Sequence, residues 1–366
     1  MLRHDWSGSC VHTESTFHQL APYIGKLKSS IAAALVEEYT KPGDVVLDPF
    51  VGAGTIALEA ATRNRSVLAF DVNPYAVLLT RAKLFAPRDP AAILERARHY
   101  LRAVERTSAS VDLRRVPAWV RRFFDPRTLR EAIAMRDVLI ERREYFLLGC
   151  LLGILHHQRP GFLSYPSSHL VPYLRNNLYP RAAYPEMYEY RDVASRLTAK
   201  IARAFRRSVA IPNTLTRKCR LADIRNLRIA AKSVDAVITS PPYMNALDYV
   251  RDNRLRLWFL GVDQRNPCPE SPRNEQAFVS LMSATLFTIR RALRDGGKCI
   301  LVVGEANRSA RNLDAIAITR AMINAPATGF REETVLFDRI PDVRRARRNY
   351  RSTKRECVIV ASAVST

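Results

Sequence analysis

Two short segments of this chain carry residues whose types and spacing could do chemistry, and the first is DPFVGAGT. Asp48 ends an expected buried strand, and Gly52 and Gly54 lie in the turn that leads into a helix. Glycines let the backbone pass close to a ligand without a Cβ clash, and the helix start offers free N–H groups. Asp71 closes the next expected strand, where a carboxylate can accept hydrogen bonds from two ribose hydroxyls. The pattern favours a nucleoside-containing cofactor over a plain tight turn, and the missing third glycine argues against a dinucleotide.

The second segment is the tetrapeptide Ser240-Pro241-Pro242-Tyr243, which follows the apolar strand AVIT. The two prolines fix φ and remove two donors, while their carbonyls still accept hydrogen bonds. The tyrosine presents a flat face at the carboxyl end of the expected sheet, where α/β proteins bind ligands. A stiff acceptor beside an aromatic platform suits a planar group with an exocyclic amine. If the tetrapeptide stood alone, a strand ended by prolines with a buried tyrosine would be the better interpretation.

The elements around the first segment alternate between strand and helix. We expect a helix at 27–40, a strand at 45–50, a helix at 56–64, a strand at 65–72 and a helix at 73–84. This order predicts a parallel sheet covered by helices.

The pattern changes between residues 86 and 218, where long arginine-rich helical stretches are expected and no strand is evident. The helices are expected at 89–107, 125–157 and 192–208, around a Pro-, Ser- and Tyr-rich loop. The α/β pattern then resumes. We expect strands at 216–224, 233–243 and 298–305, helices at 245–261, 275–297 and 313–325, and a closing antiparallel pair at 332–340 and 356–363.

Positive charge is concentrated in two parts of the chain. The 366 residues include 58 Lys and Arg against 35 Asp and Glu, a formal net charge of +23. Residues 81–230 carry a net +17 and residues 341–355 a net +6, so these stretches supply the whole excess. A neutral body with two basic regions favours a polyanionic partner, nucleic acid before membrane, over a merely solvated surface.

Composition excludes several other classes of protein. The charged and apolar fractions exclude a disordered chain, and the longest apolar run, 146–155, is too short to span a bilayer. The first residues contain no apolar signal core. Six widely spaced cysteines without a CxxC pair argue against a zinc ribbon and a disulfide scaffold. We therefore expect a cytoplasmic protein with no metal and no membrane partner.

Taken together, DPFVGAGT and TSPPY resemble the amino-methyltransferases, which use S-adenosylmethionine to methylate exocyclic amines of DNA bases. The upstream FHQLAPYIGKL resembles the segment that precedes the cofactor loop in this family. The resemblance spans residues 17–84 and about 219–305, with the terminal strand pair as its continuation. It implies an α/β fold: a Rossmann-like class I methyltransferase sheet with a C-terminal antiparallel strand pair and a large, mainly helical insert.

The resemblance also implies an organisation in three parts. Residues 1–85 would hold an N-terminal segment and the cofactor-binding half of the core, and residues 86–218 a basic helical insert for target recognition. Residues 219–366 would hold the catalytic half with the SPPY turn and a basic C-terminal loop. Many SPPY enzymes run in the opposite, permuted order, so the order of elements leaves open which part reads the DNA sequence.

Roles for single residues follow from the same resemblance, with S-adenosylmethionine as the cofactor. Its methionine part would be lined by Asp48, Phe50, Gly52 and Gly54, its ribose held by Asp71, its adenine approached by Asp223, and its carboxylate covered by Tyr23 and Lys26. Pro49, Thr55 and Asn73 are further expected cofactor contacts. In the catalytic turn, completed by Pro242, Ser240 and the Pro241 carbonyl would accept hydrogen bonds from the target amine, and Tyr243 would stack on the target base.

The first residue of the tetrapeptide bears on which base is methylated. Family members with Ser at this position are mostly N4-cytosine enzymes, and those with Asp or Asn mostly N6-adenine enzymes, so Ser240 favours cytosine. We expect direct methyl transfer to a base flipped out of duplex DNA, without a covalent intermediate. Alternatives are an N6-adenine DNA methyltransferase, an RNA exocyclic-amine methyltransferase acting on tRNA or rRNA, and a non-catalytic binding module. The short segment before the first strand disfavours the RNA enzymes, which often carry a separate N-terminal domain.

Arginines in the two basic stretches are candidate contacts to phosphates and, in places, to guanine edges. They are Arg121, Arg122, Arg127, Arg175, Arg206 and Arg207 in the insert, and Arg344, Arg345, Arg347 and Arg348 near the C-terminus. Simple solvent exposure is the alternative for each of them. The expected partner is double-stranded DNA, and a cognate restriction or defence nuclease is a second partner left open.

Overall fold

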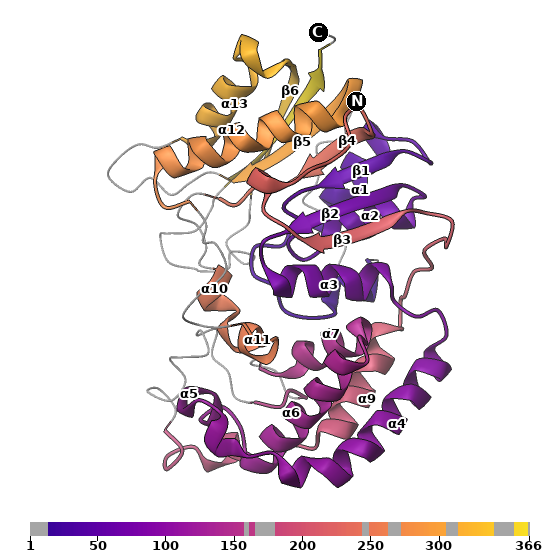
Figure 1. The fold of residues 1–366 in the computed structure, drawn as a ribbon, viewed down its shortest axis with the longest axis vertical. Coiled ribbons are helices and arrows are strands. Elements are labelled where there is room, and N and C mark those ends of the chain that lie inside the picture. Colours follow the sequence, from indigo (N-terminus) through magenta and orange to yellow (C-terminus); the bar gives the residue numbers. More distant parts are fainter. Residues whose placement is uncertain are drawn as a thin grey trace.

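The structure is a computed structural model, and it describes residues 14–156, 161–164, 180–243, 249–262, 272–304, 314–339 and 355–364. A sheet with its covering helices forms one end of the molecule, and the helices of the insert form the other, with α3 (Pro74–Leu84) between them (Figure 1).

The sheet has seven strands in the order β3-β2-β1-β4-β5-β7-β6. Neighbouring strands pair in parallel from β3 to β5, whereas β7 runs antiparallel to both β5 and β6. The strands are β1 Val45–Asp48, β2 Ser66–Asp71, β3 Arg217–Leu221, β4 Val234–Thr239, β5 Leu293–Gly304, β6 Phe330–Arg339 and β7 Arg355–Ala363. This order, with its antiparallel C-terminal pair, confirms the expected Rossmann-like class I methyltransferase fold.

The strand order reverses between β1 and β4. From β1 the chain builds outward through β2 to β3, and it then returns to the other side of β1 with β4. A crevice opens at such a reversal because the two connections leave the carboxyl edge in opposite directions. The two segments singled out in the sequence, the loop after β1 and the turn after β4, therefore lie at this point.

Helices cover both faces of the sheet and bury two apolar clusters. One cluster joins side chains of β1, β2 and β4 to α1 (Ser29–Tyr39), α2 (Thr55–Thr62) and α3. The other joins the opposite face to α12 (Glu275–Ala292) and α13 (Ala315–Ile323). Several helices begin at an Asn or Asp whose side chain accepts a hydrogen bond from the first turn, and Asn73 does so for α3 with a proline at the next position.

The insert shares the first cluster and has no separate apolar core in the part of the chain described. It contains α4 (Pro90–Thr107), α5 (Ala118–Arg121), α6 (Pro126–Glu141), α7 (Tyr145–Ile154) and α9 (Val193–Ala204). All but the first residue of α7 are buried, and this helix packs against α3. Gly149 permits the close approach to α3, because a Cβ there would lie under 3.0 Å from Ala82. Gly153 faces the segment before α1 instead, where a Cβ would lie under 3.0 Å from the Leu20 carbonyl oxygen.

Three expected helices differ from the sequence prediction. The stretch 125–157 forms two helices, because Arg143 adopts a left-handed conformation (φ 55°) between α6 and α7. The described part of 245–261 is also divided, into α10 (Tyr249–Asp252) and α11 (Arg254–Phe259). The stretch 275–297 is helical only to Ala292, because Leu293 already pairs with β4 as the start of β5.

Candidate active site

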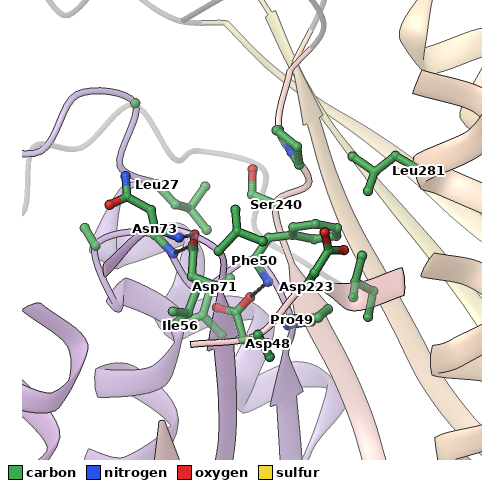
Figure 2. Close-up of a pocket in the computed structure, with 18 of the residues that line it drawn as sticks. Leu27, Asp48, Pro49, Phe50, Ile56, Asp71, Asn73, Asp223, Ser240 and Leu281 are labelled. Carbon is green, nitrogen blue, oxygen red and sulfur yellow. Dashed lines mark hydrogen bonds between the residues drawn. The ribbon is translucent and has the colours of Figure 1, made fainter. Parts of the chain in front are cut away.

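A cavity opens at the carboxyl ends of β1, β2 and β4 (Figure 2). Its walls are the loop after β1, the segment around Tyr23–Leu27, the residues that follow β2 and β3, the turn after β4 and one side of α12. Ten of the eleven expected cofactor residues line it: Tyr23, Lys26, Asp48, Pro49, Phe50, Gly52, Thr55, Asp71, Asn73 and Asp223. The eleventh, Gly54, lies in the loop without lining the cavity.

Asp48 is the most deeply buried carboxylate of the cavity, with 1% of its surface exposed. Its Oδ1 accepts a hydrogen bond from Thr239 Oγ1 at 2.6 Å and another from the Phe50 amide at 3.3 Å. Burial raises the pKa of Asp48 to about 7, although the bond from Thr239 favours the charged form. Asp48 therefore links the ends of β1 and β4 beneath the cavity.

Asp71 holds the glycine loop in place. Its Oδ2 accepts from the Gly52 amide at 2.8 Å, and its Oδ1 accepts from the Asn73 amide at 2.9 Å. Each carboxylate oxygen has a further lone pair, so these bonds leave acceptor capacity toward the cavity. Burial raises the pKa of Asp71 to about 6, although backbone hydrogen bonds from Asn73, Gly52 and Val72 favour the charged form. The arrangement is compatible with a ribose diol at this carboxylate.

The loop itself packs tightly on the helix behind it. Gly52 and Gly54 have φ values of 49° and 71°, in the left-handed region that favours glycine. A Cβ at Gly54 would lie 2.5 Å from Thr80 Oγ1 on α3. Beneath the loop, the buried Lys83 donates a hydrogen bond to the Ala53 carbonyl, and burial lowers the pKa of this lysine to about 7. Sequence reasoning missed Lys83, since a lysine in a helix is usually exposed.

The residues present fit S-adenosylmethionine. Thr55 Oγ1, at the first residue of α2, is buried, lines the cavity and has no hydrogen-bond partner among the described residues. An unpartnered hydroxyl beside the free amides of a helix start suits a carboxylate group. Asp71 would take the ribose, and Asp223, fixed by the Arg225 side chain, lines the cavity beyond β3 toward an adenine.

Two of the four residues of the Ser-Pro-Pro-Tyr turn line the cavity. Ser240 and Pro242 line the cavity, whereas the buried Pro241 and the half-buried Tyr243 do not. Ser240 Oγ donates to the Val302 carbonyl at 3.0 Å, and it lies 3.3 Å from the Tyr243 hydroxyl. Tyr243 in turn donates to Glu356 Oε1 at 3.0 Å. Sequence reasoning missed Glu356, whose only local signal is a charged residue at the start of an apolar strand.

The expected nucleic-acid contacts are only partly described. Arg121, Arg122, Arg127, Arg206 and Arg207 have exposed side chains, and Arg127 lies 4.1 Å from the centre of the Tyr190 ring. Arg175, Arg344, Arg345, Arg347 and Arg348 lie outside the described residues.

One contact joins the insert to the segment after the catalytic turn. Arg254 of α11 lies over the ring of Trp119 on α5, 4.2 Å from its centre. The arginines at the end of α5 are therefore close to the chain that follows the SPPY turn, which the sequence did not predict. Neither a group of His, Cys, Asp and Glu suited to a metal nor a helix long and apolar enough to cross a membrane occurs in the described ranges.

Part of this chain is similar to a family of known proteins. Residues 21–81, which include the glycine loop and Asp71, match the model of a family described as DNA methylase. The type II methyltransferase M.BsoBI of Geobacillus stearothermophilus is 23% identical over 293 residues, covering 68% of this chain and 54% of that protein. The type II methyltransferase M.XycI of Xanthomonas campestris pv. cyanopsidis is 44% identical over 45 residues, 12% of this chain and 15% of that protein.

The matched regions cover about half of M.BsoBI and a much smaller part of M.XycI. Among solved structures, TrmN from Thermus thermophilus aligns with 95% of this chain and 52% of its own, with a TM-score of 0.36 and 14% identity. The rRNA methyltransferase aviRa from Streptomyces viridochromogenes aligns over 99% of this chain and 94% of its own, with a TM-score of 0.36 and 16% identity.

Proposed function

We propose that the chain is a DNA amino-methyltransferase that methylates the exocyclic N4 of cytosine in duplex DNA. The match of residues 21–81 to the DNA methylase family model supports this proposal. S-adenosylmethionine would be the donor, and when bound it supplies a methyl group carried on a positively charged sulfur. The target base would leave the duplex to enter the cavity, since an exocyclic amine cannot be reached inside the stack.

The observation that carries this proposal is that the glycine loop and the SPPY turn line one cavity. Asp71 and Thr55 stand on the side of the loop, and Ser240 on the side of the turn. A donor held by the first two residues would thus meet an acceptor group held by the third. Catalysis of this kind depends mainly on positioning and on electrostatic stabilisation.

The catalytic turn would act on the nucleophile. The lone pair of an exocyclic amine is delocalised into the ring, so the amine is a poor nucleophile. Hydrogen bonds from its protons to Ser240 Oγ and the Pro241 carbonyl would favour a tetrahedral nitrogen and direct its lone pair toward the methyl donor. Ser240 can accept such a bond because its own proton is given to the Val302 carbonyl.

The basic insert would bind the DNA backbone. Arg121 and Arg122 are exposed at the end of α5, and the Trp119–Arg254 contact places this helix beside the segment that follows the catalytic turn. Phosphate contacts at this position would orient the duplex over the cavity without reading its sequence.

Product analysis with labelled S-adenosylmethionine tests the proposal. Purified protein is incubated with unmethylated bacterial genomic DNA, or with total RNA, and the nucleosides are separated and identified by mass spectrometry. N4-methylcytosine in DNA is the expected product. N6-methyladenine would replace the cytosine assignment by adenine, and label in RNA alone would overturn the DNA substrate.

A variant then connects the activity to the turn. Ser240→Ala should lower methyl transfer strongly while leaving cofactor binding, measured by calorimetry, unchanged. Ser283→Ala, at an exposed position of α12, is the matched control and should behave as wild type. Equal activity of the two variants would show that Ser240 does not contact the reacting amine.

A further inference from the structure

Two hydrogen bonds lead from the catalytic turn to the last strand of the sheet. The Ser240 and Tyr243 hydroxyl oxygens lie 3.3 Å apart, and Tyr243 donates to Glu356 Oε1 at 3.0 Å. Glu356 begins the apolar part of β7, directly opposite Gly304 at the end of β5. Val302, which accepts from Ser240 at 3.0 Å, lies two residues earlier on β5. Only the antiparallel insertion of β7 next to β5 brings the carboxylate to this turn.

The chemistry of these groups gives the hydrogen bonds a direction. A hydroxyl has one proton and two lone pairs, whereas an ionised carboxylate and a carbonyl can only accept. Because Tyr243 gives its proton to Glu356, its oxygen can only accept from Ser240. The Val302 carbonyl likewise only accepts, so the single proton of Ser240 points away from the cavity. Toward the cavity Ser240 then presents lone pairs alone.

Charged neighbours determine whether Glu356 stays ionised. Burial raises the pKa of Glu356, and so does Asp338, which lies directly opposite on β6, while the hydrogen bond from Tyr243 and the charge of Lys28 act in the other direction. Lys28 Nζ lies 2.6 Å from Asp338 Oδ2, next to the start of α1. One lysine thus compensates two carboxylates beside the turn.

We infer that Glu356 is a specificity-determining positioning residue, which together with the Val302 carbonyl holds Ser240 Oγ as a hydrogen-bond acceptor and so favours an amine over a carbonyl on the target base. The inference rests on the proposed function and deepens it. At the 4-position, cytosine carries an amine and uracil carries a carbonyl. A uracil O4 is a hydrogen-bond acceptor, so it would face the lone pairs of Ser240 with no proton between the two oxygens. A site that offers only acceptors therefore binds a carbonyl more weakly than an amine.

The test compares binding of two duplexes at pH 8. The site that the wild-type enzyme methylates is first located from its own products, and the duplex is then made with cytosine or uracil there, opposite an abasic position. The abasic partner removes the difference in pairing strength. Dissociation constants are measured by fluorescence anisotropy with S-adenosylhomocysteine present, so no transfer occurs. Wild type should prefer cytosine by about tenfold or more.

Glu356→Gln keeps the size of the side chain but adds an amide donor, so Tyr243 can turn its proton toward Ser240. This variant should lose part of the preference, because a proton from Tyr243 would occupy one Ser240 lone pair while the Val302 carbonyl still accepts from Ser240. Glu356→Asp, still acceptor-only, should lose less of it. Glu333→Gln, a partly exposed residue of β6 that pairs with Lys298, is the control and should keep the wild-type ratio. Tyr243→Phe removes the hydroxyl itself, so no proton can be turned toward Ser240 and the preference for cytosine should stay.

The outcomes separate this inference from the proposed function. If wild type labels DNA but Glu356→Gln keeps the full preference for cytosine, Glu356 does not influence the polarity of Ser240, and the proposed function stands. If wild type labels no DNA, both are overturned. Binding of S-adenosylhomocysteine should be unchanged in all variants, because Glu356 does not line the cavity.

Discussion

The carboxylate of Asp48 accepts a hydrogen bond of 2.6 Å from Thr239 Oγ1 and so connects the ends of β1 and β4. These adjacent strands lead, respectively, into the glycine loop and the catalytic turn. The two functional segments are thus joined below the cavity by one side-chain contact, in addition to the backbone pairing. A rigid connection of this kind keeps donor and acceptor sites at a constant separation.

Removing the Thr239 hydroxyl should destabilise the protein. Thr239→Val leaves the buried Asp48 carboxylate with one hydrogen bond fewer, which costs about 1–3 kcal/mol in the free energy of unfolding. Urea denaturation at pH 8 measures this loss. Thr239→Ser keeps the hydroxyl and is the matched control, so equal stability of the Ser and Val variants would contradict the role of the bond.

The raised pKa of Asp48 predicts a pH dependence of stability. Its pKa is about 7 in the folded chain against 3.8 as the ordinary value. Between these values the folded chain holds more protons than the unfolded chain, so this group's contribution to stability falls as pH rises from about 4 to about 7. Asp48→Asn should remove that contribution. Urea denaturation of wild type and Asp48→Asn at several pH values checks this. As pH rises from about 4 to about 7, the free energy of unfolding of the variant should increase relative to that of wild type. A constant difference would be inconsistent with the raised pKa.

Gly54 should tolerate no side chain. Alanine there would combine φ 71° with a Cβ 2.5 Å from Thr80 Oγ1. Gly296→Ala is the matched control, because Gly296 has φ 75° but nothing within 4 Å of a Cβ. The control should cost about 1–2 kcal/mol for the backbone conformation alone, and Gly54→Ala about 1–3 kcal/mol more for the overlap. Similar losses in urea denaturation would mean that Thr80 moves aside freely.

The sequence was sufficient for features that depend on local pattern. Asp48, Gly52 and Asp71 could be placed at strand ends and in a turn, since apolar runs and small residues mark these positions. Parallel strands bring their carboxyl ends to one edge, so a shared site with Ser240 followed from the expected sheet. The break at Arg143 left no such mark, because an Arg-Arg pair is also common inside helices.

Contacts between distant segments could not be predicted in the same way. Tyr243 and Glu356 are 113 residues apart in sequence and meet only because β7 lies beside β5. The sequence indicated an aromatic platform at Tyr243, whereas the structure gives its hydroxyl a carboxylate partner. The contact of Arg254 with Trp119 likewise depends on how the insert packs, which periodicity does not determine.

Loss of the Lys83 ammonium should weaken cofactor binding. The lysine donates from beneath the loop to the Ala53 carbonyl, between the two glycines. Lys83→Met fills the same space without a donor, and we expect about tenfold weaker binding of S-adenosylhomocysteine in calorimetry, near 1.4 kcal/mol, a typical value for one hydrogen bond. Both measurements are made at pH 6, below the Lys83 pKa of about 7, so that the lysine is charged. Stability should then change little, because a buried charge is removed along with its bond. Lys218→Met, at an exposed position on β3, is the control. Equal affinities of both variants would mean that the loop holds its shape without the lysine.

Arginines at the end of α5 should contribute to the salt dependence of DNA binding. Each phosphate contact lowers the slope of log K against log salt concentration by about 0.9, through release of condensed cations. If Arg121 and Arg122 each contact a phosphate, Arg121→Gln with Arg122→Gln makes the slope shallower by about 1.8. Arg98→Gln with Arg102→Gln removes the same charge from α4, where both side chains already pair with Glu95.

Fluorescence anisotropy between 50 and 200 mM salt, a range over which such contacts change affinity by orders of magnitude, measures both slopes. Because the two double variants have equal net charge, a shallower slope in the α5 variant alone assigns the effect to contact rather than to overall charge, whereas identical slopes would remove α5 from the DNA interface.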